Sequence, residues 1–183
     1  MSEELLINHC SPTLAGIKTG NMFSFFFSDL EQMKKCIRNW NCQLSDKGLR
    51  ILPLKVENGR ALIYVYRPSH LVEDLSRNEA ESILKDLGYA CRTPEQCVSE
   101  LMRRIRQSTD FPHEVGLFLG YPPEDVKGFI DNKACGCKCV GCWKVYGDED
   151  KAKKTFAKYK KCTAIYCKLF AKGRSLERLT VAA

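Results

Sequence analysis

Cysteine is the residue type with the most obvious chemical potential in this sequence. Residues 133–146 read KACGCKCVGCWKVY, which places four thiols within eight positions, at Cys135, Cys137, Cys139 and Cys142. Thiolates bind zinc, iron–sulfur clusters and Cu(I). Four ligands this close in sequence would form strained rings around one metal. Structural zinc sites usually avoid this strain by combining two separated pairs of ligands. The spacing therefore favours Cys139 and Cys142 as half of a metal site.

The other half of such a site would come from elsewhere in the chain or from a second subunit. His9 and Cys10 are adjacent candidates for the missing ligands, and zinc or iron would be the expected metal. Two alternatives stay open for the Cys139–Cys142 pair. It could be a dithiol redox couple, although it does not begin a helix after a strand. It could also consist of reduced thiols that bind no metal.

Cys10 and His113 offer a different chemistry, that of a nucleophile and a general base. If the fold brings the two side chains together, His113 could deprotonate the Cys10 thiol, and Glu114 could orient the histidine. His9 cannot serve Cys10 in this way on a regular element, because the side chains of adjacent residues diverge. The alternative is structural, since both histidines lie close to prolines and could cap turns.

The segment GLFLGYPPED, residues 116–125, predicts a third kind of site. A strand that ends at Tyr121 and leads through two prolines into a helix would expose the tyrosine. It would also leave backbone N–H groups free to bind an anion or another small ligand. Lys18 and Thr19 could contribute if the segment that contains them lies alongside. The same residues would also form a rigid turn with no ligand, which is the commoner role of such a sequence.

The net charge of +7 is concentrated near the C-terminus. Residues 148–173 predict a long basic helix that begins at Asp148, with aromatic and small side chains on one face. The opposite face would carry Lys151, Lys154, Lys158, Lys161, Lys168 and Lys172. This face could dock on a polyanion, which would make the protein an interaction module. We favour a solvated helix face, since lysine is a common solubilising residue, and nucleic acid is not expected as a partner.

A sheet and several helices would position these residues. Asn58-Gly59 predicts a two-residue hairpin turn. A regular register would then set Val56, Leu54 and Leu52 opposite Ala61, Ile63 and Val65. Parts of 14–27, 114–121 and 139–146 are also expected to be extended. The sequence thus indicates an α+β fold, in which helices pack on one side of a mixed or mainly antiparallel sheet.

Local signals predict where the helices begin. Ser28, Asn78 and Thr93 each precede an acidic or amide side chain at the spacing of a capping box. Pro122 and Pro123 precede a short helix, because proline is favoured in the first helical turn. The apolar positions that follow these signals recur every three to four residues, as one buried helix face requires.

Length and composition predict a single soluble domain, 1–183. The chain has 183 residues, of which 44% are hydrophobic and 28% charged, as in an ordinary globular protein. The first residues, MSEELLINHC, lack the apolar run of a signal peptide, and no apolar run is long enough to span a membrane. The 11 cysteines are odd in number and irregularly spaced. A reducing cytoplasm is therefore the expected location, with no membrane partner.

Three blocks together resemble a known family: HCSPTLAGIKTGNMF (9–23), FPHEVGLFLGYPPEDVKGFI (111–130) and GCWKVYGDEDKAKKTFAKYKKC (141–162). The family is an uncharacterised one of small cytosolic proteins from anaerobic Gram-positive bacteria, a domain of unknown function. The resemblance covers nearly the whole chain and implies no activity. The cysteines and histidines favour a metal- or redox-linked binding or accessory protein with a small ligand or a protein as its partner. The alternatives are a small enzyme that uses Cys10 and His113, and an interaction module that uses the lysine-rich helix.

Overall fold

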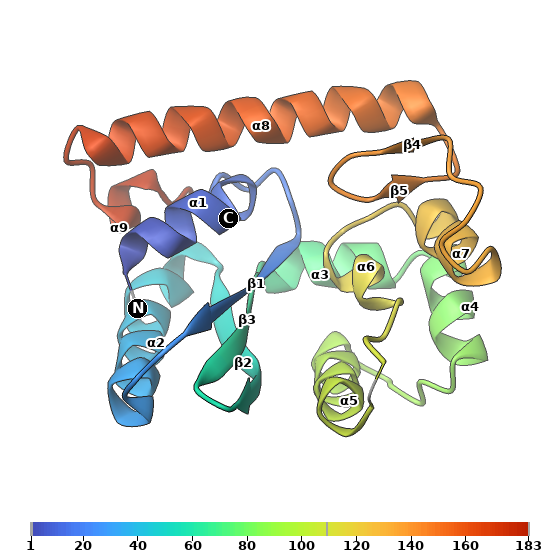
Figure 1. Ribbon diagram of the computed structural model, residues 1–183, viewed down its shortest axis with the longest axis horizontal. Helices are drawn as coiled ribbons and strands as arrows, with labels where there is room; N and C mark the ends of the chain where they lie inside the picture. The colour runs from blue at the N-terminus through green and yellow to red at the C-terminus, as the bar shows by residue number, and fades with distance from the viewer. Residues whose placement is uncertain (1, 109, 183) are drawn as a thin grey trace.

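The computed structural model describes residues 2–108 and 110–182, which form helices around a small antiparallel sheet (Figure 1). The helices are α1 (Glu3–Leu14), α2 (Leu30–Leu44), the 3-10 turn η1 (Ser45–Lys47), α3 (Pro68–Leu75), α4 (Asn78–Asp86), α5 (Pro94–Gln107), α6 (Val115–Phe118), α7 (Pro123–Asp131), α8 (Glu149–Ala171) and α9 (Leu176–Leu179). The strands are β1 (Gly20–Phe26), β2 (Arg50–Glu57), β3 (Arg60–Tyr66), β4 (Cys139–Val140) and β5 (Lys144–Val145). The sequence-based prediction of an α+β fold is confirmed.

The main sheet is antiparallel throughout, with the strand order β1-β3-β2, while β4 and β5 form a separate pair. The β2–β3 hairpin turns at Asn58-Gly59, as predicted. Both residues have a positive φ, 48° and 70°, which a type I′ turn requires. Glu57 and Arg60 lie opposite each other and close the turn.

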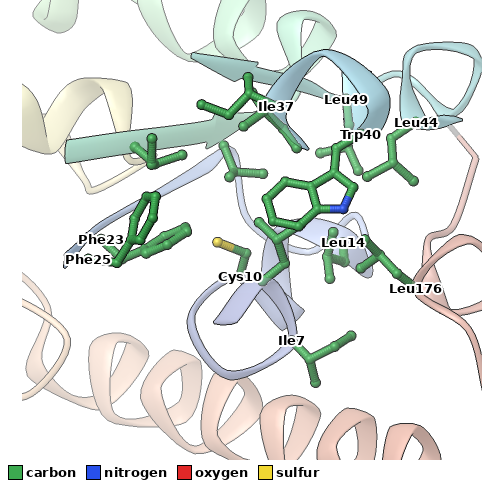
Figure 2. Packing of buried hydrophobic residues seen from close by; sticks show 14 of the residues in the cluster. Ile7, Cys10, Leu14, Phe23, Phe25, Ile37, Trp40, Leu44, Leu49 and Leu176 are labelled. Carbon is green, nitrogen blue, oxygen red and sulfur yellow. The ribbon is translucent and has the colours of Figure 1, made fainter. Parts of the chain in front are cut away.

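The sheet is buried on both faces, not on one face as expected. Along β3, Ile63 and Val65 belong to a cluster with residues of α1, α2 and α9, which we call the first cluster (Figure 2). Tyr64 and Tyr66 point the other way and belong to a second cluster with residues of α3 to α7. The strand side chains alternate between the two faces, so one short sheet supports two groups of helices.

A bulge in β2 changes the register that a regular hairpin would have. Val56 has its predicted partner, but the pairing shifts between Pro53 and Lys55 and leaves Leu54 as the extra residue. Pro53 has no N–H to donate to β3, which makes this position suited to a bulge. Leu54 therefore belongs to the second cluster, whereas Ile51 belongs to the first.

Side-chain caps account for the starts of several helices. Thr93 and Asp148 accept hydrogen bonds from backbone N–H groups in the first turns of α5 and α8, as predicted. Helix α2 is capped by Asp29 in place of the predicted Ser28, and the Asp29 carboxylate accepts from two backbone N–H groups. Asn78 is the first residue of α4 and not its cap.

Residues 115–118 form the short helix α6, although the segment 114–121 was expected to be extended. A short apolar run fits a buried helix as well as a strand, so its periodicity alone does not distinguish the two. The chain leaves α6 at Gly120, where φ is +73°. The segment 139–146 is extended only in β4 and β5.

Helix α8 runs along one side of the molecule, over α1 at one end and over the β4–β5 hairpin at the other (Figure 1). Its predicted apolar face is buried or half-buried, through Ala152, Phe156, Tyr159, Thr163, Tyr166 and Phe170, and the six lysines predicted to lie opposite are exposed. Among the described residues, none of the helices has the length and apolar character needed to cross a membrane.

Candidate functional site

Lys18 is a buried charge in the connection between α1 and β1. Only 7% of the residue is exposed. Its Nζ lies 5.3 Å from the ring centroid of Tyr121 and 5.8 Å from that of Tyr159. Within residues 2–108 and 110–182, the ammonium group has no hydrogen bond or ion pair. The faces of two tyrosine rings thus lie within the distance of a cation–π contact.

Two glycines allow the chain to bring this lysine close to Tyr121. A Cβ atom at Gly20 would lie 2.9 Å from the carbonyl oxygen of Phe118. A Cβ atom at Gly120 would lie 2.8 Å from the Cβ of Thr19. The loop after α6 therefore contacts the connection between α1 and β1. The predicted ligand site requires this contact, because Lys18 and Thr19 could contribute only if their segment lay alongside Tyr121.

Burial lowers the pKa of Lys18 to about 8, and the nearby thiols of Cys142 and Cys10 offset part of this effect. Burial also raises the pKa of Tyr121 and of Tyr159 to about 12. At neutral pH the lysine is therefore mainly charged, and both phenols keep their protons. The group is a cation flanked by neutral hydroxyl-bearing rings.

Lys18 lines a cavity of about 240 Å³ whose other polar side chains are Thr19, His70, Glu73, Asp74 and Tyr159. The Asp74 carboxylate accepts a hydrogen bond from the Thr19 hydroxyl and forms an ion pair with Arg77 at 2.7 Å. The charge of Asp74 is thus compensated without Lys18. The lysine is left as a buried cation that faces a polar cavity.

The cavity brings together two of the predicted ligand-binding residues, Lys18 and Thr19, and Tyr121 lies directly behind Lys18. His70, Asp74 and Tyr159 also line the cavity, although no sequence motif marks them as ligand-binding residues. His70 and Asp74 are four residues apart on α3, a spacing that places them on one helix face.

Asp125 fixes the β4–β5 hairpin against Tyr121. One carboxylate oxygen accepts from the indole Nε1 of Trp143 at 2.6 Å, and the other accepts from the backbone N–H groups of Tyr146 and Gly147 at 2.7 and 2.8 Å. The Trp143 ring then stacks on Tyr121 with centroids 4.7 Å apart. Asp125 is 3% exposed, so these partly buried donors depend on a single carboxylate for their acceptor.

Replacing Asp125 with asparagine is expected to lower the free energy of unfolding by about 2 kcal/mol, because an amide offers one acceptor oxygen where three donors need two. Urea unfolding measures this loss, and the emission of Trp143 should shift to longer wavelength. Asp131→Asn is the matched control on the same helix, because Asp131 is exposed and forms a surface ion pair with Lys127. Equal stability of the two variants would contradict this role of Asp125.

The predicted metal ligands lie in different surroundings. Cys10 is fully buried in the first cluster (Figure 2), where burial raises its pKa well above its ordinary value. The His9 ring stacks on Phe23 with centroids 5.0 Å apart. Cys139 pairs with β5, and the Cys142 carbonyl accepts from the Tyr121 hydroxyl at 3.2 Å. In the described part of the chain, no three His, Cys, Asp or Glu side chains gather as metal ligands would.

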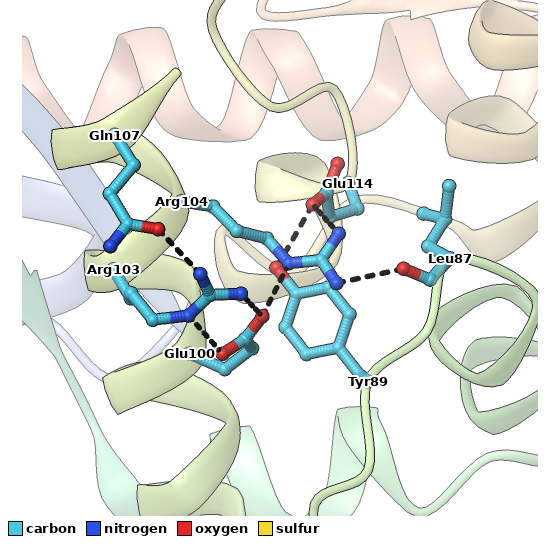
Figure 3. Close-up of polar contacts among 7 residues, drawn as sticks. All are labelled: Leu87, Tyr89, Glu100, Arg103, Arg104, Gln107 and Glu114. Carbon is cyan, nitrogen blue, oxygen red and sulfur yellow. Dashed lines mark hydrogen bonds and ion pairs between the residues drawn. The ribbon is translucent and has the colours of Figure 1, made fainter.

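The predicted catalytic residues are also separated. His113 is exposed and its ring meets the edge of Phe129, with centroids 4.9 Å apart, whereas Cys10 lies in the first cluster. Glu114 is 5% exposed and accepts a hydrogen bond from the Tyr89 hydroxyl at 3.0 Å. Arg104 lies over the Tyr89 ring and 3.6 Å from Glu114 (Figure 3). The carboxylate of Glu114 is thus part of a buried tyrosine–arginine network.

A family model described as "Protein of unknown function (DUF3793)" matches residues 6–180. No curated protein and no solved structure matches the chain significantly.

Proposed function

The chain belongs to DUF3793, a family of proteins of unknown function, and we propose that it binds a small organic anion in the cavity beside Lys18. One observation carries this proposal. Lys18 as a residue is 7% exposed, and the described residues give its ammonium group no carboxylate and no carbonyl oxygen as a hydrogen-bond or ion-pair partner. An anionic ligand would supply the missing charge.

The energy cost of burying the Lys18 charge favours the binding of an anion. Removing an ammonium group from water costs several kcal/mol when no partner replaces the water. A cation–π contact with a desolvated cation returns about 2 kcal/mol, so the two tyrosine rings offset part of the cost but supply no negative charge. A ligand anion next to Lys18 would be attracted more strongly than in bulk water, because the surrounding protein screens the charges less. The same weak screening would keep the anionic group on the Lys18 side of the cavity, away from the carboxylates of Glu73 and Asp74.

The size and lining of the cavity restrict the ligand. Its volume of about 240 Å³ has room for a small carboxylate or phosphate ester, since one water molecule occupies about 30 Å³. Glu73 and Asp74 can accept hydrogen bonds, and the Tyr159 hydroxyl can donate one. The proposed ligand class is therefore a small anion that also carries hydroxyl or amino groups.

The sequence-based hypotheses remain predictions beside this proposal. A metal- or redox-linked role for Cys139 and Cys142 would need further ligands from a second subunit. A Cys10–His113 enzyme would need Cys10 to leave the first cluster. An interaction module on α8 is supported by its exposed lysines, and salt-insensitive binding to polyanions would count against it.

Isothermal titration calorimetry at pH 7 tests the proposal with inorganic phosphate, glycerol phosphate, lactate and malate. At least one of these anions is expected to bind the wild type with a Kd below about 1 mM, and Lys18→Met should weaken that binding at least about tenfold, because a buried ion pair loses one partner. Wild-type affinity should also fall above pH 8, as Lys18 loses its proton.

Lys158→Met is the matched control, because it removes an exposed lysine one residue from Tyr159 on α8. This variant should bind as tightly as the wild type. An affinity unchanged by Lys18→Met would place binding elsewhere on the molecule, and the absence of binding for all four anions would overturn the proposal.

A further inference from the structure

Two cysteines outside the 135–142 run meet at the start of α5. Cys91 lies in the loop before the helix and is half-buried, while Cys97 lies in its second turn and is 9% exposed. Cys91 packs against the second cluster, which contains Cys97, and Cys91 is one cause of the raised pKa of Cys97. Both thiols line a cavity of about 640 Å³.

We propose that Cys91 and Cys97 form a reversible dithiol–disulfide couple that exchanges with low-molecular-weight disulfides. Two features of the pair support this inference: both cysteines line one cavity that a small molecule can enter, and they differ in exposure. Cys91 is the accessible thiol and therefore the attacking one. Cys97 is the buried thiol that completes the reaction.

The exchange balances as two displacement steps. The Cys91 thiolate first attacks one sulfur of the small disulfide, and the other sulfur leaves as a thiolate that takes up a proton. Cys97 then gives up its proton, and its thiolate attacks the Cys91 sulfur. The second half of the small disulfide leaves as a thiolate, which takes up that proton and becomes a thiol. Two electrons and two protons pass from the protein thiols to the small disulfide, which is reduced to two thiols.

The surroundings favour this order of attack. Burial, together with the adjacent Cys91, raises the pKa of Cys97 to about 12, so Cys97 stays protonated in the resting protein. Proline at the first position of α5 and the Thr93 cap fix the start of the helix that carries Cys97. The attacking thiol thus lies in a loop, and the completing thiol lies on a fixed helix.

The lining of the cavity indicates which small disulfides would enter. Lys85 and Arg92 offer two positive charges and Glu81 one negative charge, while Leu84 and Tyr89 supply apolar surface. Basic side chains in the wall of the cavity attract carboxylates. Peptide-like disulfides that carry carboxylates, of which oxidised glutathione is a convenient probe, are the expected class. This inference does not depend on the Lys18 site.

The test treats reduced protein, freed of reductant under nitrogen, with one equivalent of oxidised glutathione. The products are alkylated and mapped by mass spectrometry. The wild type is expected to lose two hydrogen atoms and to yield a Cys91–Cys97 disulfide. Cys97→Ala should stop at a mixed disulfide with glutathione on Cys91, and Cys91→Ala should form neither product.

Cys42→Ser is the matched control, because it removes an exposed thiol on α2. It should leave the Cys91–Cys97 reaction unchanged. Circular dichroism establishes that each variant is folded. In Cys97→Ala, Cys91 is expected to react at least about tenfold faster than Cys42. Equal rates at the two thiols, or a wild-type disulfide between other cysteines, would overturn the inference.

Discussion

Replacing Arg67 with methionine is expected to lower the free energy of unfolding by about 4 kcal/mol. Arg67 is 1% exposed. It donates hydrogen bonds to the carbonyl oxygens of Thr13 at 2.7 Å, Leu14 at 2.9 Å, Lys47 at 3.1 Å and Val181 at 2.7 Å. Methionine would remove the side-chain donor from these four carbonyl oxygens. Those of Thr13 and Leu14, which belong to the negative end of the α1 dipole, would keep only a backbone donor, the N–H of Gly16 and of Val181.

Urea unfolding measures the loss, provided that the slope with denaturant stays constant. Arg67→Lys should restore less than half of it, because one ammonium group cannot reach all four carbonyl oxygens. Arg50→Met is the matched control, since Arg50 is exposed and its side chain donates to the neighbouring Leu49 carbonyl. A loss below about 1 kcal/mol for Arg67→Met would show that water replaces the guanidinium group readily.

The second large effect is an increase in the free energy of unfolding, whereas replacing Arg67 lowers it. Lys18→Met is expected to raise the free energy of unfolding at pH 7 by about 3 kcal/mol, which is what a pKa lowered from 10.5 to about 8 represents. Methionine occupies a similar volume and brings no charge into the interior. A gain in stability on losing a polar residue is typical of positions that serve binding at the cost of stability.

The pH dependence of this effect follows from linkage. The pKa of Lys18 is about 8 in the folded protein and near 10.5 in the unfolded chain, so between these values the unfolded chain binds more protons. The free energy of unfolding of the wild type therefore increases as the pH rises from 8 to 10.5. The advantage of Lys18→Met should be largest below pH 8 and vanish near pH 10.5. A variant less stable than the wild type at pH 7 would mean that the tyrosine rings fully compensate the charge.

Local signals predicted the elements whose boundaries depend on neighbouring residues. The Asn58-Gly59 turn and the Thr93 cap each act over a few positions, so the sequence is sufficient to place them. The bulge at Leu54 and the helix at 115–118 depend on which cluster receives each side chain. Tertiary packing therefore decides the local structure of a short apolar segment, and neighbouring residues in the sequence do not indicate the result.

The candidate site was predictable only in part, for the same reason. Glycine- and proline-rich neighbours indicated a possible site at Lys18, Thr19 and Tyr121. Tyr159, in contrast, has the sequence pattern of an ordinary apolar position on α8. The Cys91–Cys97 pair has no recognised spacing, whereas the prominent Cys139–Cys142 spacing gathers no metal ligands among the residues that the structure describes. Proximity of thiols across a loop and a helix comes from folding, not from spacing in the sequence.

The most direct test of the central claim is the pKa of Lys18, followed by NMR of its ¹⁵N-labelled side chain with and without the tightest-binding of the four anions. Without an anion, the pKa is expected near 8. With the anion at saturation, it should rise by at least about one pH unit, because a ligand that binds the ammonium form stabilises it. An ordinary pKa near 10.5 without an anion, or a pKa that the anion leaves unchanged, would contradict the account.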